Sequence, residues 1–149
     1  MVRTSATLAS PIEVTVNSQN TPHLVYRHDP TSQLELAVGG ASWSLTTLGD
    51  EGEAVSTQHP AVVLSNDSLA VGLVASNGTG TNLAVWIYDG STLSRHNITN
   101  HTDVNSELQL TTLANGSLLL ASLTTDGTLS VHELWPGSSD WHEHTVPQP

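Results

Sequence analysis

A segment of short apolar runs and turns recurs three times in this chain, at a spacing just under fifty residues. The three copies are residues 33–48, 82–98 and 126–141. Each begins with a Leu-x-(Leu/Val) pair, and the first leucine of the pair is Leu34, Leu83 or Leu129. These leucines are 49 and 46 residues apart. A repeat of this length, filled with short strands and turns, is typical of β-propeller blades rather than of helical repeats.

Two further features align the three copies. A turn that contains glycine follows the apolar pair, at residues 39–40, 89–90 and 136–137. Two large residues five positions apart come next: Trp43 and Leu48, Leu93 and Ile98, Trp141 and Val146. Glycine at the bend and alternating apolar residues on both sides predict a strand, a tight turn and a second strand in each copy.

Two more apolar runs precede each copy, joined by Asn, Asp, Ser or Gly. They are residues 11–16 and 23–26, 60–67 and 68–75, and 107–116 and 117–123. Such pairs predict hairpins. The second run of each pair is nearly continuous in Leu, Val and Ala, which is expected of a strand buried on both faces.

The expected fold is therefore an all-β propeller with three four-stranded blades per chain, which is half of a six-bladed ring. Residues 1–10 are expected to be a flexible leader. Residues 11–149 form the three-blade unit, with blades at about 11–58, 59–104 and 105–147. Ser, Thr, Asn, Val and Leu dominate the sequence, which favours strands over helices.

Charge and composition restrict the partners. The net charge is −11, there is no lysine, and the three arginines are Arg3, Arg27 and Arg95. A chain with so few cations cannot neutralise phosphates, which excludes nucleic acid and argues against anionic membranes. No apolar run is long enough to cross a bilayer, and without cysteine no disulfide can form.

Five N-x-S/T sequons point to a secreted glycoprotein. They begin at Asn66, Asn77, Asn97, Asn100 and Asn115. Most of them fall at predicted turns, where an oligosaccharide could be attached. The alternative is that a β protein rich in Ser, Thr and Asn generates sequons by chance. The predicted location is secreted or extracellular.

Three blades make only an arc of a ring. Propellers have about four to eight blades, and ring closure protects their edges. An isolated arc would expose the apolar faces of its end blades to water. We therefore expect a homo-oligomer in which a second copy completes a six-bladed ring about a two-fold axis. The alternative is that the missing blades belong to a longer propeller.

With the blades aligned, the chain resembles the six-bladed fungal fucose-specific lectins. Their blades carry an Arg-Val-Tyr-Tyr-like strand, an Asp-x-x-Gly-x-Ile-x-Glu strand, Trp-Asp-Gly and a further Trp. The matching pieces here are residues 24–26, 88–90, 126–131 and 135–137, with Trp43 and Trp141. The resemblance implies a six-bladed lectin fold and ligands bound between blades.

The chain departs from this family at the sugar-binding positions. Leu36, Val85 and Val131 stand where the family has glutamate, and Leu24 stands where the first blade would have arginine. A bidentate arginine and a carboxylate hold sugar hydroxyls strongly, and aliphatic residues cannot replace those hydrogen bonds. These departures from the family imply pockets that are more apolar than those of the family.

Six residues are predicted to bind the ligand: Trp86, Trp135, Tyr26, Tyr88, Arg27 and His132. Tryptophan rings stack on sugars and on apolar ligands. Trp86 alternates with core residues and so faces a neighbouring blade, whereas Trp135 lies at a turn. Trp43 and Trp141 are expected instead to fill space between blades.

No metal site or cofactor is predicted. His142 and His144 share a strand face, and His132 lies one strand away, but solvated histidines on an outer strand explain this pattern better than a metal centre does. Recognised catalytic motifs are absent from the sequence.

The sequence leaves three functions open. The first is a lectin-like binding module that holds a carbohydrate or a small apolar molecule between blades. The second is a secreted enzyme of fungal natural-product biosynthesis, similar to the hetero-Diels–Alderases suggested for some relatives of this fold, with an apolar cavity that orients two reactants. The third is a structural or engineered half-propeller without a ligand. Whether the chain is an enzyme stays open.

Overall fold

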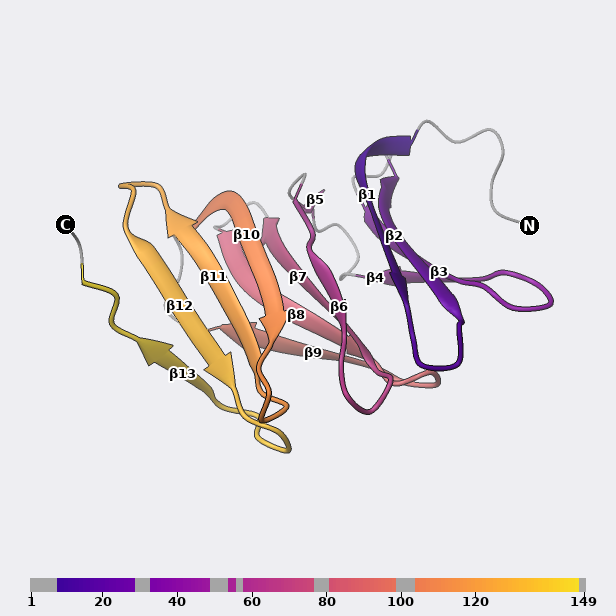
Figure 1. Ribbon diagram of the computed structural model, residues 1–149. Helices are drawn as coiled ribbons and strands as arrows, with labels where there is room; N and C mark the ends of the chain where they lie inside the picture. The colour runs from indigo at the N-terminus through magenta and orange to yellow at the C-terminus, as the bar shows by residue number, and fades with distance from the viewer. Residues whose placement is uncertain are drawn as a thin grey trace.

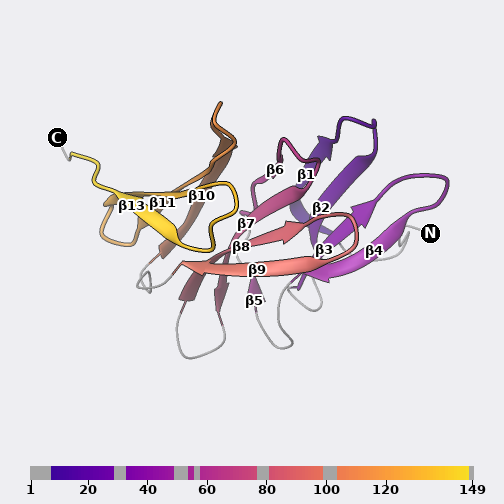
Figure 2. The same ribbon diagram turned by 90° about the horizontal axis from the view of Figure 1, so that it is seen from below.

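The computed structural model describes residues 8–28, 33–48, 54–55, 58–76, 81–98 and 104–147, and these residues form thirteen β-strands and no helix. The strands build three antiparallel sheets that stand side by side like the ribs of a fan (Figure 1). We call the sheets blades 1, 2 and 3 in chain order. The view from below shows blade 2 between the other two (Figure 2).

Each blade uses consecutive strands. Blade 1 contains β1 (Leu8–Val16), β2 (Pro22–His28), β3 (Gln33–Val38) and β4 (Ser44–Leu48). Blade 2 contains β5 (Ala54–Val55), β6 (Ala61–Val63), β7 (Leu69–Ser76), β8 (Thr81–Tyr88) and β9 (Leu93–Ile98). Blade 3 contains β10 (Val104–Thr112), β11 (Leu118–Thr124), β12 (Leu129–Leu134) and β13 (Trp141–His144).

Neighbours in sequence are neighbours in each sheet. Blade 1 has the order β1-β2-β3-β4, and blade 3 has the order β10-β11-β12-β13. In blade 2, β5 and β6 both pair with β7, so the first position of the sheet is occupied by two short pieces. The predicted all-β class and the division into three four-stranded units are confirmed.

Strand register confirms the alignment of the three repeats. Leu34 pairs with Leu48 across β3 and β4, and Leu83 pairs with Ile98 across β8 and β9. In blade 3, Leu134 pairs with Trp141. In blade 2, the equivalent residue Tyr88 pairs with Leu93, so Trp141 and Leu93 occupy equivalent places. The residues aligned by sequence therefore occupy equivalent places in the three sheets.

The first turn of each blade is built in the same way. Residues 17–21, 64–68 and 113–117 each close with two backbone hydrogen bonds in the same pattern. The fourth residue of each turn, Asn20, Asp67 or Gly116, has a positive φ, between 59° and 85°. Asn, Asp and Gly are the residues that adopt this left-handed conformation most readily.

The first strand of each blade, which we call the innermost strand, carries the same irregularity; it is β1 in blade 1, β5 with β6 in blade 2, and β10 in blade 3. In β1, two extra residues separate Ala9, opposite Arg27, from Ile12, opposite Tyr26. The register of β10 shifts in the same way between Val104 and Leu108, and the gap between β5 and β6 lies at the equivalent place in blade 2. Bulges of this kind bend a strand and interrupt its pairing.

Two apolar cores join the blades. One lies between blades 1 and 2 and contains Val25, Leu34, Leu36, Leu48, Leu69, Val71, Leu73, Ala75, Ala84 and Trp86. The other lies between blades 2 and 3 and contains Ala70, Val74, Leu83, Val85, Ile98, Leu108, Leu110, Leu118, Leu120 and Leu134. Strand β7 is buried on both faces along residues 69–75, as predicted, because it has a blade on each side.

Two boundaries differ from the expected ones. Strand β1 begins at Leu8, inside the segment expected to be a leader, because its first residues pair with the end of β2. Residues 1–7 lie outside the described residues. Ala54 and Val55 pair with β7 and so belong to blade 2, although the expected boundary placed them in blade 1. Both differences arise because the innermost strand continues beyond its bulge, where apolar periodicity gives no signal.

Candidate functional site

A groove of about 290 Å³ lies between blades 2 and 3. Its floor is apolar and includes Ile87 from β8 and Leu118 from β11. Its rim comes from turns, with Ser65 and Asn66 on the blade 2 side and residues 135–138 on the blade 3 side. An apolar floor with a few polar groups at the rim suits a small amphipathic ligand.

The two junctions between blades differ at one turn position. Gly116 lines the groove and occupies in blade 3 the turn position that Asp67 occupies in blade 2. Between blades 1 and 2, Asp67 bridges the two turns by accepting hydrogen bonds from the backbone N–H of Ser18 (2.9 Å) and from its hydroxyl (2.5 Å). Between blades 2 and 3, Ser65 stands where Ser18 does, but Gly116 has no side chain to reach it.

The space at Gly116 is large enough for a side chain. A Cβ atom placed there would lie 3.8 Å from the Ser65 hydroxyl oxygen and 3.4 Å from Cγ of Pro136, which are ordinary van der Waals contacts. A short side chain would therefore fit at this position without a steric clash, although the φ of 85° at Gly116 strains the backbone of any residue with a Cβ atom.

Trp135 lines the groove just after the end of β12 and is 51% exposed. Its ring stacks on the imidazole of His142, with ring centroids 4.0 Å apart and an angle of 22° between the planes. Stacking holds a large aromatic side chain in one orientation at the surface. A fixed and exposed indole is a ready surface for the apolar face of a sugar.

A carboxylate supports the same corner of blade 3. The Glu133 carboxylate lies 2.9 Å from Nε2 of His144. The neighbouring Ser117 hydroxyl, and to a smaller extent His144 and Trp135, lower the pKa of Glu133 from its ordinary value, while burial acts in the opposite direction. Glu133 is therefore ionised at neutral pH, as its contact with His144 requires.

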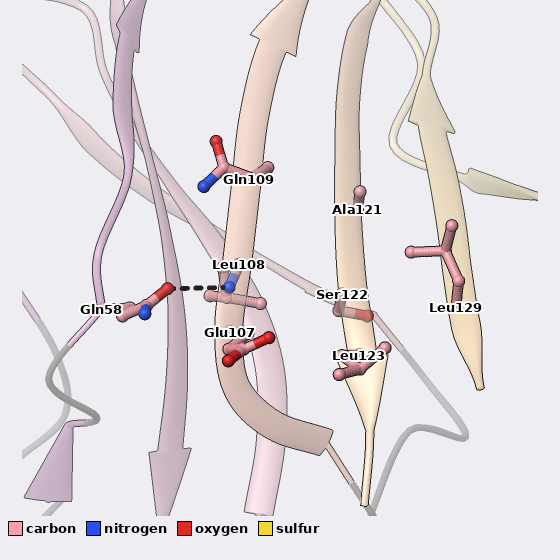
Figure 3. A pocket seen from close by; sticks show the side chains of 8 residues that line it. All are labelled: Gln58, Glu107, Leu108, Gln109, Ala121, Ser122, Leu123 and Leu129. Atoms are coloured by element: carbon pink, nitrogen blue, oxygen red, sulfur yellow. Dashed lines mark hydrogen bonds between the residues drawn. The ribbon is translucent and has the colours of Figure 1, made fainter. Parts of the chain in front are cut away.

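A second pocket, of about 250 Å³, lies beside the bulge of β10 (Figure 3). Gln58 of blade 2 reaches this bulge, and its side-chain oxygen accepts a hydrogen bond from the backbone N–H of Leu108 at 3.2 Å. Glu107, Leu123 and Leu129 also line the pocket. Gln109, Ala121, Leu123 and Leu129 of its lining belong to the face of blade 3 that is turned away from blade 2.

The structure distributes the six predicted ligand-binding residues over several places. Trp135 lines the groove between blades 2 and 3. Trp86 is buried in the core between blades 1 and 2, where Arg95 lies 5.8 Å from its ring centroid. Tyr88 packs against the same core and donates a hydrogen bond from its hydroxyl to the Gly90 carbonyl at 2.8 Å.

The other three residues lie elsewhere. Tyr26 is buried in blade 1 and donates a hydrogen bond to Glu35 at 2.8 Å. Arg27 is half-buried near the end of β2, and His132 is buried in β12. Of the six, Trp135 alone lines either of the two pockets described above.

The histidines do not converge on one point. His132 pairs with Glu143, whereas His142 pairs with Glu133, so His132 projects from the face of blade 3 opposite to His142 and His144. Among the described residues, no three His, Cys, Asp or Glu side chains gather as a metal ion would require. The same part of the chain has no apolar helix of membrane-spanning length.

The aliphatic residues at the family's sugar-binding positions have packing roles. Leu36 and Val85 are fully buried, one in each of the two cores between blades. Val131, the third member of the set, lies on the face of blade 3 that no blade covers. A ligand between blades must therefore bind closer to the turns.

Five residues at the groove were not among the six predicted to bind the ligand. Ser65, Asn66, Gly116 and Ser138 line the groove, and His142 stacks on Trp135. They lie in turns or on the outermost strand, where hydrophobic periodicity carries no signal. One signal was available: aligning the first turns of the three blades places Gly116 opposite Asp67 and Asn20 and marks it as the position without a side chain.

No protein-family model matches the chain, and no curated protein sequence matches it significantly. Among solved structures, a fucose lectin from Kordia zhangzhouensis, solved in complex with methyl-fucoside, matches with a TM-score of 0.57 and 11% sequence identity. The match covers 93% of this chain and 100% of that chain. The lectin is bacterial, and the fungal family that the sequence motifs resemble is not confirmed. At this identity the likeness concerns the fold alone, which in this chain is an arrangement of three antiparallel β-sheets.

Proposed function

We propose that this chain is a lectin-like, carbohydrate-binding module whose ligand binds in the groove between blades 2 and 3. The observation that carries the proposal is the exposed ring of Trp135, stacked on His142 at the rim of an open groove. An indole contributes about 1 kcal/mol of stacking energy beyond simple burial of area. The hydroxyl and amide groups of Ser65, Asn66 and Ser138 supply hydrogen bonds for a polyol.

The fold supports this proposal. The structural neighbour is a fucose lectin in complex with methyl-fucoside, so a similar fold can present a sugar site. The groove also lies between adjacent blades, where the sequence resemblance places ligands. The comparisons support neither the alternative of an enzyme similar to the hetero-Diels–Alderases nor the alternative of a half-propeller without a ligand.

We further propose that the three blades belong to a six-bladed ring. The two end blades each have one face that no blade covers, whereas blade 2 is covered on both sides. A ring of six blades falls within the usual range of closed propellers.

Secretion and glycosylation remain part of the proposal. Asn66, Asn97 and Asn115 are exposed, as an acceptor asparagine must be. Asn77 and Asn100 lie outside the described residues. Asn66 lines the groove, so an oligosaccharide on its side chain would compete with a ligand.

The test is titration calorimetry with methyl-fucoside and a panel of other monosaccharide glycosides, on unglycosylated protein. We expect binding of at least one sugar with a dissociation constant in the range of about 10 µM to 1 mM. Substituting Trp135→Ala should weaken that binding about tenfold, because it removes the stacking surface. Trp43→Phe is the matched control, since Trp43 lies in blade 1 and does not line the groove.

Two results would refute the proposal. One is that no sugar in the panel binds at millimolar concentration. The other is that Trp135→Ala and Trp43→Phe weaken binding equally, which would place the sugar away from Trp135.

A further inference from the structure

The outward face of blade 3, which is turned away from blade 2, is apolar along β11 and β12 and polar toward β10 and β13. Its apolar residues are Leu119, Ala121, Leu123, Leu129 and Val131, and its polar residues include Gln109, Glu133, His142 and His144. Leu129 holds the register position of Leu83, but Leu83 is 0% exposed and Leu129 is 39% exposed. The difference arises because blade 3 covers Leu83 and no blade covers Leu129.

The outward face of blade 1, which is also turned away from blade 2, shows the complementary pattern. Ile12, Val14 and Val16 project from β1 and are 50%, 61% and 53% exposed. In blade 3, Leu108 and Leu110 hold the positions of Ile12 and Val14, and both are buried against blade 2. The outward face of blade 1 is therefore equivalent to the face with which blade 3 packs on blade 2.

The chain already contains this contact twice. Blade 2 packs on blade 1, and blade 3 packs on blade 2, each time through the same register positions. Each outward end face holds the same register positions as one side of these two contacts, with Glu133 where the internal contacts have Val38 and Ile87. The occupant that fits both end faces is thus a blade of the same design, and a second copy of this chain supplies one.

A polar contact at the bulge adds to this match. Gln58 of blade 2 accepts a hydrogen bond from the backbone N–H of Leu108 in blade 3. Glu107 in blade 3 and Gln58 in blade 2 occupy equivalent positions, because each lies five residues before the end of β10 or β6. The Glu107 side chain is exposed. Ile12 holds in blade 1 the position of Leu108.

We propose that a second copy of this chain docks its blade 1 on the outward face of blade 3, and that Glu107 accepts a hydrogen bond from the backbone N–H of Ile12 in that copy. Two copies make two such contacts about a two-fold axis and close a ring of six blades. The pocket beside β10, lined by Glu107, Leu123 and Leu129, then becomes part of the contact between copies. This inference is independent of the proposed sugar binding.

The first experiment is sedimentation equilibrium of the full chain without sugar, at about 1 to 50 µM. We expect a single species at twice the chain mass of 15.7 kDa. Val14→Asp places a charge at the centre of the contact and should raise the dimer dissociation constant at least about a hundredfold. Circular dichroism checks that the variant keeps its β structure. Thr125→Asp, which adds the same charge in the exposed β11–β12 turn, should leave the dimer intact.

The second experiment tests the polar contact. Glu107→Ala should weaken the dimer about tenfold or more, because each of the two contacts loses an acceptor. Glu107→Gln restores the residue type that Gln58 provides in the internal contact, and we expect it to preserve the dimer. Variants that lose dimerisation through unfolding are identified by their circular dichroism and set aside.

A monomer at 50 µM, or an assembly with a number of copies other than two, would overturn the proposal. So would folded Val14→Asp protein that dimerises as tightly as the unsubstituted chain. If Glu107→Gln weakens the dimer as much as Glu107→Ala, the role of Glu107 is wrong. None of these readouts uses sugar, so the proposed function can fail while this inference stands, and the reverse also holds.

Discussion

At the scale of single residues, the two junctions between blades differ at one turn position. Asn20, Asp67 and Gly116 share a backbone conformation and the same pattern of turn hydrogen bonds. Asp67 bridges to Ser18 in the neighbouring blade, whereas Gly116 makes no side-chain bridge to Ser65. Under the proposed function, the missing bridge at Gly116 leaves room for the ligand.

This comparison predicts the effect of Gly116→Asp. The introduced carboxylate should accept a hydrogen bond from Ser65, as Asp67 does from Ser18, and so fill the groove. Aspartate tolerates the left-handed backbone conformation, since Asp67 has a φ of 64°. We expect sugar affinity measured by calorimetry to fall at least about tenfold while the midpoint of thermal unfolding stays within a few degrees.

The matched control for this substitution is Gly127→Asp. Gly127 has a φ of 88° in the β11–β12 turn, and a Cβ atom there would meet nothing within 4 Å. The control carries the same added charge and the same backbone strain but lies outside the lining of the groove. Unchanged sugar binding by Gly116→Asp would place the ligand elsewhere, with the outer surface of Trp135 as the next candidate.

At the scale of strands, position in the array decides burial more than sequence does. Strands β7 and β11 are both rich in Leu, Val and Ala, and each was expected to be buried on both faces. Strand β7 is buried on both faces, whereas β11 alternates between buried and half-buried residues. The reason is that blade 2 has neighbours on both sides and blade 3 has one.

The same contrast predicts unequal costs for two equivalent substitutions. In the monomeric Val14→Asp background, Leu83→Ala should cost about 3 kcal/mol of unfolding free energy, because it leaves a cavity in a sealed core. Leu129→Ala should cost less than about 1 kcal/mol there, because Leu129 is already partly exposed. Urea denaturation measures both values. Equal costs would mean that Leu129 is covered in the monomer.

At the scale of the whole molecule, net charge opposes the proposed association of two copies. The net charge is −11, so two copies repel each other at long range. The proposed contact has an apolar part on β11 and β12, with Glu107 and Glu133 on the same face, and its short-range packing must exceed this repulsion.

This balance predicts the effect of salt on association. Raising the ionic strength from about 0.01 M to 0.5 M shortens the Debye length from about 30 Å to about 4 Å and screens the repulsion. The dimer dissociation constant measured by sedimentation should therefore fall severalfold. A rise with salt would instead indicate that ion pairs between opposite charges hold the two copies together.

The sequence by itself determined the strands, the blades and their alignment. The reason is that apolar alternation and turn glycines are local signals, and three copies reinforced one another. The equivalence of Leu34, Leu83 and Leu129, visible in the sequence, reappears in the register of the sheets. The same signals placed Trp135 in a turn and Trp86 on a face toward a neighbouring blade.

Only the tertiary structure decided which residues form the groove and which faces stay uncovered. Ser65 and Gly116 are far apart in sequence and meet because blades 2 and 3 pack side by side. Tyr26 and Trp86 were predicted to bind a ligand and are buried, because a strand does not reveal from its own residues whether a neighbour covers it. Local periodicity encodes how each sheet is built, and the packing between sheets determines where a ligand or a second copy can bind.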